Sequence, residues 1–262
     1  TYLTYDTTTQ VGVMTNYFVY PKDKYNNSIY NCSIPFNATV KSSLKDYIPF
    51  QRYLGCQNAQ YKYEYNVSMI GTYTIDVTYQ GDDITNSPGI VTASAGPIYP
   101  GLSVLTVQST ITAGTQGTFE IDVYDRFNNT IVKCENISQM SWSEKIVEEP
   151  SNGNHKVVSC QQGAGKYNGV LTPFVAGVEH LQVSLKGELI GSKSVPFTVV
   201  AGPISANGSR AYPVDGFAGV KADFGIEVSD AYANKISTCS EDASNFAISL
   251  SGPSNTSTKS AS

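Results

Sequence analysis

The sequence has little charge, few histidines and no long apolar stretch. Charged residues make up 15% of the 262 residues, and the formal net charge is −5. This balance provides no basic surface for nucleic acid or for anionic lipid headgroups. The longest apolar runs fall far short of the roughly 18 to 20 residues that a membrane-spanning helix needs. We therefore expect no nucleic-acid partner and no membrane insertion within this segment.

Motifs that carry catalysis or hold a cofactor are also missing. The sequence contains no nucleophile elbow, no Walker loop, no dinucleotide fingerprint and no H-E-x-x-H pattern. Its two histidines, His155 and His180, lie in different local contexts, and we interpret His180 as a surface residue. The sequence predicts that the chain is not an enzyme, with no catalytic residues, no metal site and no cofactor.

The carboxylate clusters are better explained by loops and turns than by a site. Glu144, Glu148 and Glu149 lie on one polar stretch before a proline, which we interpret as a solvated loop. Asp82 and Asp83 fall in a predicted hairpin turn, where Asp is favoured because its side chain bonds to the local backbone. A calcium site at this turn is the weaker alternative.

What the sequence does contain is one ten-residue pattern in three copies. The pattern D-x-[FY]-x-N-x-I-x-x-C begins at Asp23, Asp125 and Asp230. A repeat of about 100 residues is a small domain copied in tandem, because solenoid units are only about 20 to 45 residues long. The Asp and the Asn four residues later are typical of turns. Three copies at one position favour an architectural role over a unique active site.

Strand patterns fill each repeat. Apolar and polar residues alternate over residues 72–79, 119–124 and 181–186, and the pattern of 119–124 returns at 224–229. No segment repeats its apolar residues every 3.6 positions, whereas Gly and Pro are frequent. Short alternating strands with many turns indicate an all-β fold, an antiparallel sandwich with one face of each sheet buried.

Two aromatic features have a structural and a functional interpretation. Tyr61, Tyr63 and Tyr65 occupy alternate positions, so one face of that strand is all tyrosine. This stripe is predicted to be the buried face, and the alternative is a contact surface, where Tyr is enriched. Trp142 is the only tryptophan, and we expect it to pack in a core near a disulfide; the alternative is a binding role.

A second repeat marks the domain junctions. The sequence Ala-Gly-Pro-Ile at residues 95–98 returns at 201–204, each time after a strand-like run. Proline ends a strand because it has no N–H for the ladder. We predict domains at 1–95 and 96–201 and an incomplete domain at 202–262, arranged end to end with limited hinge freedom. We expect the chain to continue past Ser262 rather than to be completed by a strand from another chain.

The five cysteines follow the repeat. Cys32 and Cys56 are 24 residues apart, Cys134 and Cys160 are 26 apart, and Cys239 stands alone. We predict the disulfides Cys32–Cys56 and Cys134–Cys160, with a partner for Cys239 just past the last residue. Closing each loop is worth roughly 3 kcal/mol in the chain-entropy model. Disulfides imply an oxidising compartment; the alternative is buried free thiols in a cytosolic protein.

Acceptor sequences for N-linked glycans are frequent. Eight asparagines begin N-x-[ST] without an intervening proline, and together with the paired cysteines they predict an extracellular or cell-surface chain with covalent N-linked glycans. The predicted glycosylation sites are Asn26, Asn31, Asn37, Asn66, Asn128, Asn136, Asn207 and Asn255.

Several segments resemble a filamin-type immunoglobulin-like repeat. Residues 71–88 are similar to its closing strands, with the pattern G-x-Y-x-V-x-V-x-Y-x-G-x-x-I-x-x-S-P, and residues 177–197 match more loosely. Residues 119–129 and 224–234 resemble an earlier strand and its turn, and residues 246–253 resemble the middle strand. The resemblance implies tandem immunoglobulin-like β-sandwich domains.

The chain departs from cytosolic filamins in two ways. They have neither this disulfide pair nor dense glycosylation sequences, and the chain has no calponin-homology segment, so actin crosslinking is not implied. It looks closer to filamin-like repeats in extracellular surface and adhesion proteins.

The leading hypothesis is therefore an extracellular glycosylated structural protein, a rod or filament building block made of disulfide-bonded repeats. Its expected partners are other protein chains, including self-assembly end to end or laterally. The alternative is the ectodomain of a cell-surface receptor for adhesion or recognition, in mating or aggregation. Such a receptor should leave one face free of glycans, whereas a passive rod can be coated on all sides.

Overall fold

The first domain is a sandwich of two sheets. Our computed structural model of the protein describes residues 1–134, 137, 142–147, 155–212, 215–217, 220–221, 223–237, 246–251 and 256–260. One sheet has the strand order β1 (Tyr2–Tyr5), β3 (Thr15–Tyr20), β6 (Gln60–Asn66), β5 (Phe50–Gln57). The other has the order β2 (Thr8–Gln10), β9 (Gly89–Ser94), β7 (Gly71–Tyr79), β4 (Phe36–Ser42), with β8 (Asp82–Asp83) paired to β7. All pairs are antiparallel except β2 with β9.

The second domain repeats this topology strand for strand. Its first sheet has the order β10 (Val104–Val107), β12 (Gly117–Asp122), β15 (Lys166–Leu171), β14 (Lys156–Gln161). Its second sheet has the order β11 (Thr110–Thr112), β18 (Val195–Val200), β16 (Gly177–Leu185), β13 (Trp142–Ile146), with β17 (Glu188–Leu189) paired to β16 and a 3-10 turn at η2 (Ile190–Ser192). Again one pair, β11 with β18, is parallel. The predicted all-β fold of tandem immunoglobulin-like domains is confirmed.

Alternation along the strands builds each core. In β12, Phe119 and Ile121 are buried while Glu120 faces out, and in β16 Leu181, Val183 and Leu185 are buried. Because successive side chains of a strand point to opposite faces, this pattern places one face of each sheet inside the sandwich. The residues of each domain form a separate core cluster, so each sandwich has its own hydrophobic interior.

The first core is rich in tyrosine. Tyr61, Tyr63 and Tyr65 of β6 are all buried, which confirms the predicted buried face. The rings of Tyr17 and Tyr63 stack with centroids 5.0 Å apart. Burial raises the pKa of Tyr63 to about 12 and that of Tyr65 to about 12, because the charged phenolate is disfavoured in an apolar interior.

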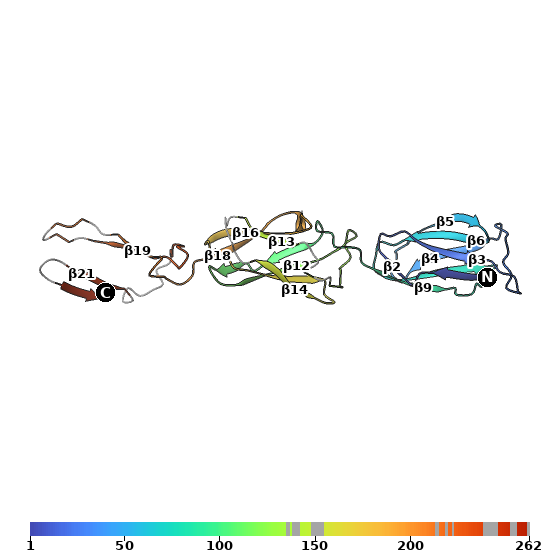
Figure 1. Ribbon diagram of the computed structural model, residues 1–262, viewed down its shortest axis with the longest axis horizontal. Helices are drawn as coiled ribbons and strands as arrows, with labels where there is room; N and C mark the ends of the chain where they lie inside the picture. The colour runs from blue at the N-terminus through green and yellow to red at the C-terminus, as the bar shows by residue number, and fades with distance from the viewer. Residues whose placement is uncertain are drawn as a thin grey trace.

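The third segment follows the second domain along the long axis of the molecule. Figure 1 shows the two sandwiches and this segment in a row. Its described strands are two hairpins: β19 (Arg210–Tyr212) pairs with β20 (Gly225–Glu227), and β21 (Ala247–Ser251) pairs with β22 (Thr256–Ser260). No helix in the described part of the chain is long and apolar enough to span a membrane.

Three local predictions need correction. Glu144 lies in β13 and not in a loop, because this segment pairs with β16 over its whole length. The turn before β8 is Gln80-Gly81, both with positive φ, so Asp82 and Asp83 are strand residues. His180 lies within β16 and is half-buried. The predictions that involve Glu148, Glu149, Cys239 and the side chain of Trp142 fall outside the described residues.

Candidate functional site: the joints between domains

Each copy of the repeated pattern folds into the same turn around its Asp carboxylate. In the second copy, Oδ1 of Asp125 accepts hydrogen bonds from the backbone N–H of Phe127 (2.8 Å) and of Asn129 (3.0 Å). The Asn129 side-chain amide donates to Oδ2 of Asp125 at 3.0 Å. Asp23 and Asp230 make the same three bonds in their own copies. We call residues 23–27, 125–129 and 230–234 the joint turns.

The joint turn also holds the linker that enters its domain. The N–H of Gly96 donates to Oδ2 of Asp125 at 2.9 Å, and the N–H of Gly202 donates to Oδ2 of Asp230 at 2.8 Å. Asp125 and Asp230 are both buried. An Asp side chain is seldom buried unless its carboxylate has bonding partners. The linker glycine supplies one of the partners, so linker and turn are fixed to each other.

The Asn of the turn reaches into the preceding domain. The Asn129 amide donates to the carbonyl of Ser68 at 2.9 Å, and its Oδ1 accepts from the N–H of Ile70 at 3.2 Å. Both groups belong to the loop between β6 and β7, at the end of the first domain. An amide side chain has one donor and one acceptor side, which matches a backbone C=O and N–H two residues apart.

The next joint repeats this bridge. The Asn234 amide donates to the carbonyl of Phe174 at 2.8 Å, and its Oδ1 accepts from the N–H of Ala176 at 2.7 Å. These residues lie in the loop between β15 and β16, the equivalent of the first domain's loop. Both Asn side chains bond only to backbone groups of the receiving loop. The bridges therefore depend on the backbone conformation of that loop and not on its side chains.

The aromatic residue of the turn packs against a glycine of the preceding domain. Phe127 is half-buried against the core cluster of the first domain. A Cβ on Gly12 would stand 2.5 Å from its ring, closer than carbon atoms pack. Gly12 also has φ +79°, a conformation that favours glycine. Position 12 therefore requires glycine for two reasons.

The second joint has the same contact. A Cβ on Gly114 would stand 2.3 Å from the ring of Tyr232, and Gly114 has φ +77°. Tyr232 also packs on Phe174, with ring centroids 4.9 Å apart. We call Gly12 with residues 68–70, and Gly114 with residues 174–176, the receiving faces.

The carboxylates of the joints are held ionised. Burial raises the pKa of Asp125, but hydrogen bonds from Gly96, Asn129 and Phe127 outweigh it and keep this pKa below its ordinary value. The pKa of Asp230 is lowered by the same balance between burial and its hydrogen bonds, with Asn234 the strongest donor. A carboxylate that accepts several N–H bonds prefers its charged form.

Sequence reasoning found the turn but not the joint. The Asp and Asn were correctly interpreted as turn residues at one repeated architectural position. Their contacts with the neighbouring domain were missed, because nothing in a local pattern says what lies across a junction. A signal was present: Gly12 and Gly114 are spaced by the same 102 residues as Asp23 and Asp125.

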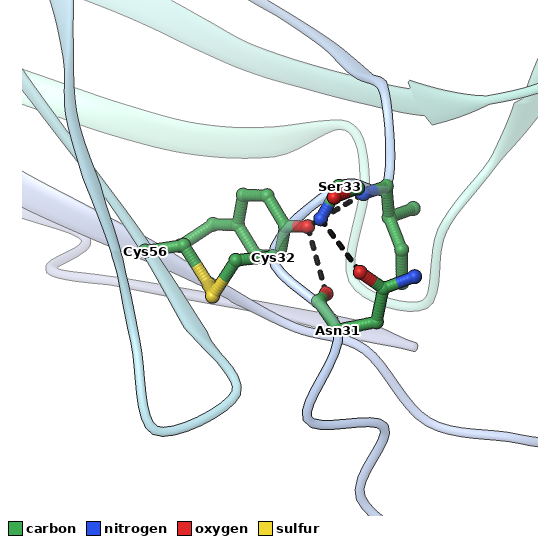
Figure 2. Close-up of a disulfide and its surroundings, with 6 residues drawn as sticks. Asn31, Cys32, Ser33 and Cys56 are labelled. Atoms are coloured by element: carbon green, nitrogen blue, oxygen red, sulfur yellow. Dashed lines mark hydrogen bonds between the residues drawn. A yellow bond between two sulfur atoms is a disulfide. The ribbon is translucent and has the colours of Figure 1, made fainter.

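Disulfides tie the ends of the first two copies of the repeated pattern to edge strands. Cys32 bonds to Cys56 in β5, and Cys134 bonds to Cys160 in β14, with Cα atoms 5.5 Å and 5.9 Å apart. Figure 2 shows the first bond beside Asn31 and Ser33, where the Asn31 side chain accepts a hydrogen bond from the Ser33 N–H at 2.9 Å. Disulfides persist in oxidising compartments, so the two bonds indicate an extracellular or cell-surface chain.

The predicted glycosylation sites are mostly exposed. Among the described residues, Asn66 is half-buried, and the exposed sites are Asn26, Asn31, Asn37, Asn128 and Asn207. Asn136 and Asn255 lie outside the described residues. Over the part of the chain that the structure describes, no three His, Cys, Asp or Glu side chains gather as metal ligands would.

Comparison with known proteins shows a shared fold. No protein-family model and no curated protein sequence matches the chain. Among solved structures, it is similar to FdeC, described as a broadly conserved Escherichia coli adhesin, at 18% identity and TM-score 0.57, over 88% of this chain and 73% of FdeC. It is also similar to invasin, described as a bacterial integrin-binding protein, at 12% identity and TM-score 0.52, over 76% of this chain and 39% of that chain. At these identities the likeness is one of fold.

Proposed function

We propose that the chain is part of an extracellular glycosylated structural protein, a rod or filament building block without catalytic activity. The observation that carries this proposal is the joint. The same turn, linker bond, Asn bridge and aromatic contact occur at both junctions, so each domain is fixed to the next in the same way. A repeated fixed joint produces a stiff rod of regular spacing, which suits a spacer or a filament.

Glycans fit the same role. Asn26 and Asn128 occupy equivalent exposed positions in the first and second joint turns. Asn128 stays exposed although its joint is filled, so a sugar there would not disturb the contact. A glycosylated surface would keep the rod soluble and leave its ends and sheet edges for contact with other chains.

Mass spectrometry of the native, non-reduced protein tests whether the chain is extracellular and whether it carries N-linked glycans. The proposal predicts peptides cross-linked through Cys32–Cys56 and Cys134–Cys160, and hexose on asparagines such as Asn26 and Asn128. Free thiols together with unglycosylated asparagines would contradict the proposal and would favour a cytosolic scaffold protein instead. Electron microscopy of the same material should then show straight particles of one width.

A receptor for adhesion or recognition is the second candidate, and one surface favours it. The edge strand β5 and the loop before it expose large apolar side chains: Ile48 is 88% exposed and Phe50 is 50% exposed, with Tyr53 and Leu54 beside them. Asn66 lies opposite Phe50 in the sheet, so a glycan there would crowd this edge. An adhesin and an integrin-binding protein with a similar fold are consistent with such a role.

The two candidates differ in what β5 should do. Beads coated with the native chain would bind cells through β5 if the chain is a receptor, and Phe50→Lys should abolish binding. A structural rod predicts cell binding that is absent or unchanged by Phe50→Lys. Glycan occupancy at Asn66 gives an independent check, since a receptor should leave this edge bare.

A further inference from the structure

In the part of the chain that the structure describes, no other domain contacts the joint turn of the first domain. Asp23, Tyr25 and Asn27 form the same turn as the two filled copies, with the same left-handed residue at Asn26 (φ 70°) as at Asn128 (φ 65°). Yet Tyr25 is 73% exposed, against 46% for Tyr232, while Phe127 is half-buried. The turn of the first domain therefore has the same internal hydrogen bonds as the other two turns, without their contacts to a neighbouring domain.

The unused bonding groups match those of the filled copies. In the described structure, Oδ2 of Asp23 accepts a hydrogen bond from Asn27, whereas Oδ2 of Asp125 accepts one from Asn129 and another from the linker N–H of Gly96. The Asn27 amide bonds to Asp23, whereas Asn129 also bridges to Ser68 and Ile70. Hydrogen bonds within the turn lower the pKa of Asp23, that of the Asn27 side chain first, so the carboxylate is already ionised for a further donor.

A hydroxyl group bonds to the backbone just before each of the three turns. The hydroxyl of Thr1 accepts a hydrogen bond from the N–H of Lys22 at 3.2 Å, next to the turn. Ser103 holds Tyr124 in the same way at 3.2 Å, and Ser209 holds Ser229 at 3.1 Å. The support beneath all three turns is therefore equivalent.

We propose that residues 23–27 are a docking end for the receiving face of another domain of this same type. This inference rests on the proposed rod and names the kind of domain that its first joint turn binds. The occupant must offer a glycine with positive φ under Tyr25, and a loop with C=O and N–H two residues apart for Asn27. The two receiving faces within the described chain have this chemistry, and both are already filled by residues 125–129 and 230–234.

A glycan at Asn26 does not stand in the way. Asn128, its equivalent, remains exposed with its joint filled, and Ala233 occupies the same position in the third turn. The side chain at this position is therefore not part of the contact. Substituting it gives a matched control that leaves the docking groups intact.

A tandem protein tests the inference directly. Residues 1–102 are placed before Thr1 of the whole chain, which reproduces the spacing from the linker glycine to the Asp in the first natural joint. With 15N-labelled isoleucine, NMR hydrogen exchange reports the Ile70 amide of both copies of the first domain. Docking predicts two slowly exchanging Ile70 amides, the added one slowed at least tenfold relative to a tandem protein with Asn27→Ala in its second copy.

Three variants in that second copy make the result specific. Tyr25→Ala and Asn27→Ala should each restore fast exchange to the added Ile70 while the original Ile70 stays protected. Asn26→Ala should leave both amides protected, because Ala233 is native at this position. Fast exchange of the added Ile70 in the unsubstituted tandem protein would overturn the inference, and so would protection that survives both docking variants.

This outcome is separable from the fate of the proposed function. Bare asparagines and free thiols would remove the extracellular rod even if the tandem protein docks. A failed docking in the tandem protein would leave disulfides, glycans and the two natural joints untouched.

Discussion

The filled and the free joint turns are the instructive contrast in this molecule. The second turn has a buried Asp125 and an Asn129 that bridges to Ser68 and Ile70. The first turn has the same internal bonds around Asp23, but its Asp and Asn are exposed. The turn therefore folds on its own bonds, and the joint is an addition made by the neighbouring domain.

The contrast separates two jobs of one motif. Bonds inside the turn shape the local backbone in all three copies, whereas the linker bond, the Asn bridge and the aromatic contact depend on a neighbour. Substitutions at equivalent positions should therefore have unequal effects. The difference in destabilisation between equivalent substitutions in a filled and a free turn measures how much the contact with the neighbouring domain contributes.

The largest difference is expected for the Asp. Asp125→Ala removes both carboxylate acceptors of its turn and leaves the buried N–H of Gly96 without a partner. Buried hydrogen bonds to a charged group are worth about 1.5 to 3 kcal/mol each, with strong overlap between them. We expect the free energy of unfolding of the second domain to fall by on the order of 3 kcal/mol. Denaturant unfolding followed by NMR measures it, and Asp23→Ala, at an exposed position, should cost the first domain clearly less.

The aromatic contact should give the next largest difference. Phe127→Ala exposes part of the first domain's core and empties the space above Gly12. Losing a half-buried phenyl ring is worth about 1 to 2 kcal/mol. Thermal unfolding of the whole chain should show the first domain destabilised. Tyr25→Ala is the matched control, and an equal loss from it would mean that the ring acts within its own domain.

Loss of the Asn bridge should cost less free energy than loss of the aromatic contact, and its effect should be confined to the loop that the Asn contacts. Asn129→Ala removes two hydrogen bonds to the first domain, with a net value of about 1 kcal/mol in total. Amide hydrogen exchange should accelerate at Ile70 and remain unchanged at Ala176, which the other joint protects. Asn27→Ala in the same chain should change neither amide. Acceleration at both amides would point to general loosening instead of a local bridge.

Acid should loosen the joints gradually. The pKa values of Asp125 and Asp230 are lowered in the folded protein, so their stabilisation is complete above the ordinary value of about 3.9. It is lost as the pH falls through their lowered pKa values. Exchange at Ile70, corrected for intrinsic rates, should be flat between pH 7 and 5 and lose protection only below pH 4. A loss of protection already at pH 6 would exclude these carboxylates as the cause.

Much of the fold was predictable because its signals are local or repeated. Alternation along residues 119–124 and 181–186 reflects the two faces of a strand, and the cysteine spacing follows the repeat. Glu144 was misplaced because a charged residue within a strand resembles a loop residue in sequence. The joint could not be predicted from one copy of the motif, since its partners are backbone groups of a loop 58 to 61 residues away, and backbone groups leave no mark in a sequence.

Residual dipolar couplings on the whole chain test the central claim most directly. If the joint turn fixes the first two domains to each other, amides of residues 1–95 and 96–201 will share one alignment tensor in magnitude and orientation. A double variant with Phe127→Ala and Asn129→Ala should then give two tensors of different magnitude. Two different tensors already in the unsubstituted chain would show that the domains move independently, and the account of a stiff rod would be wrong.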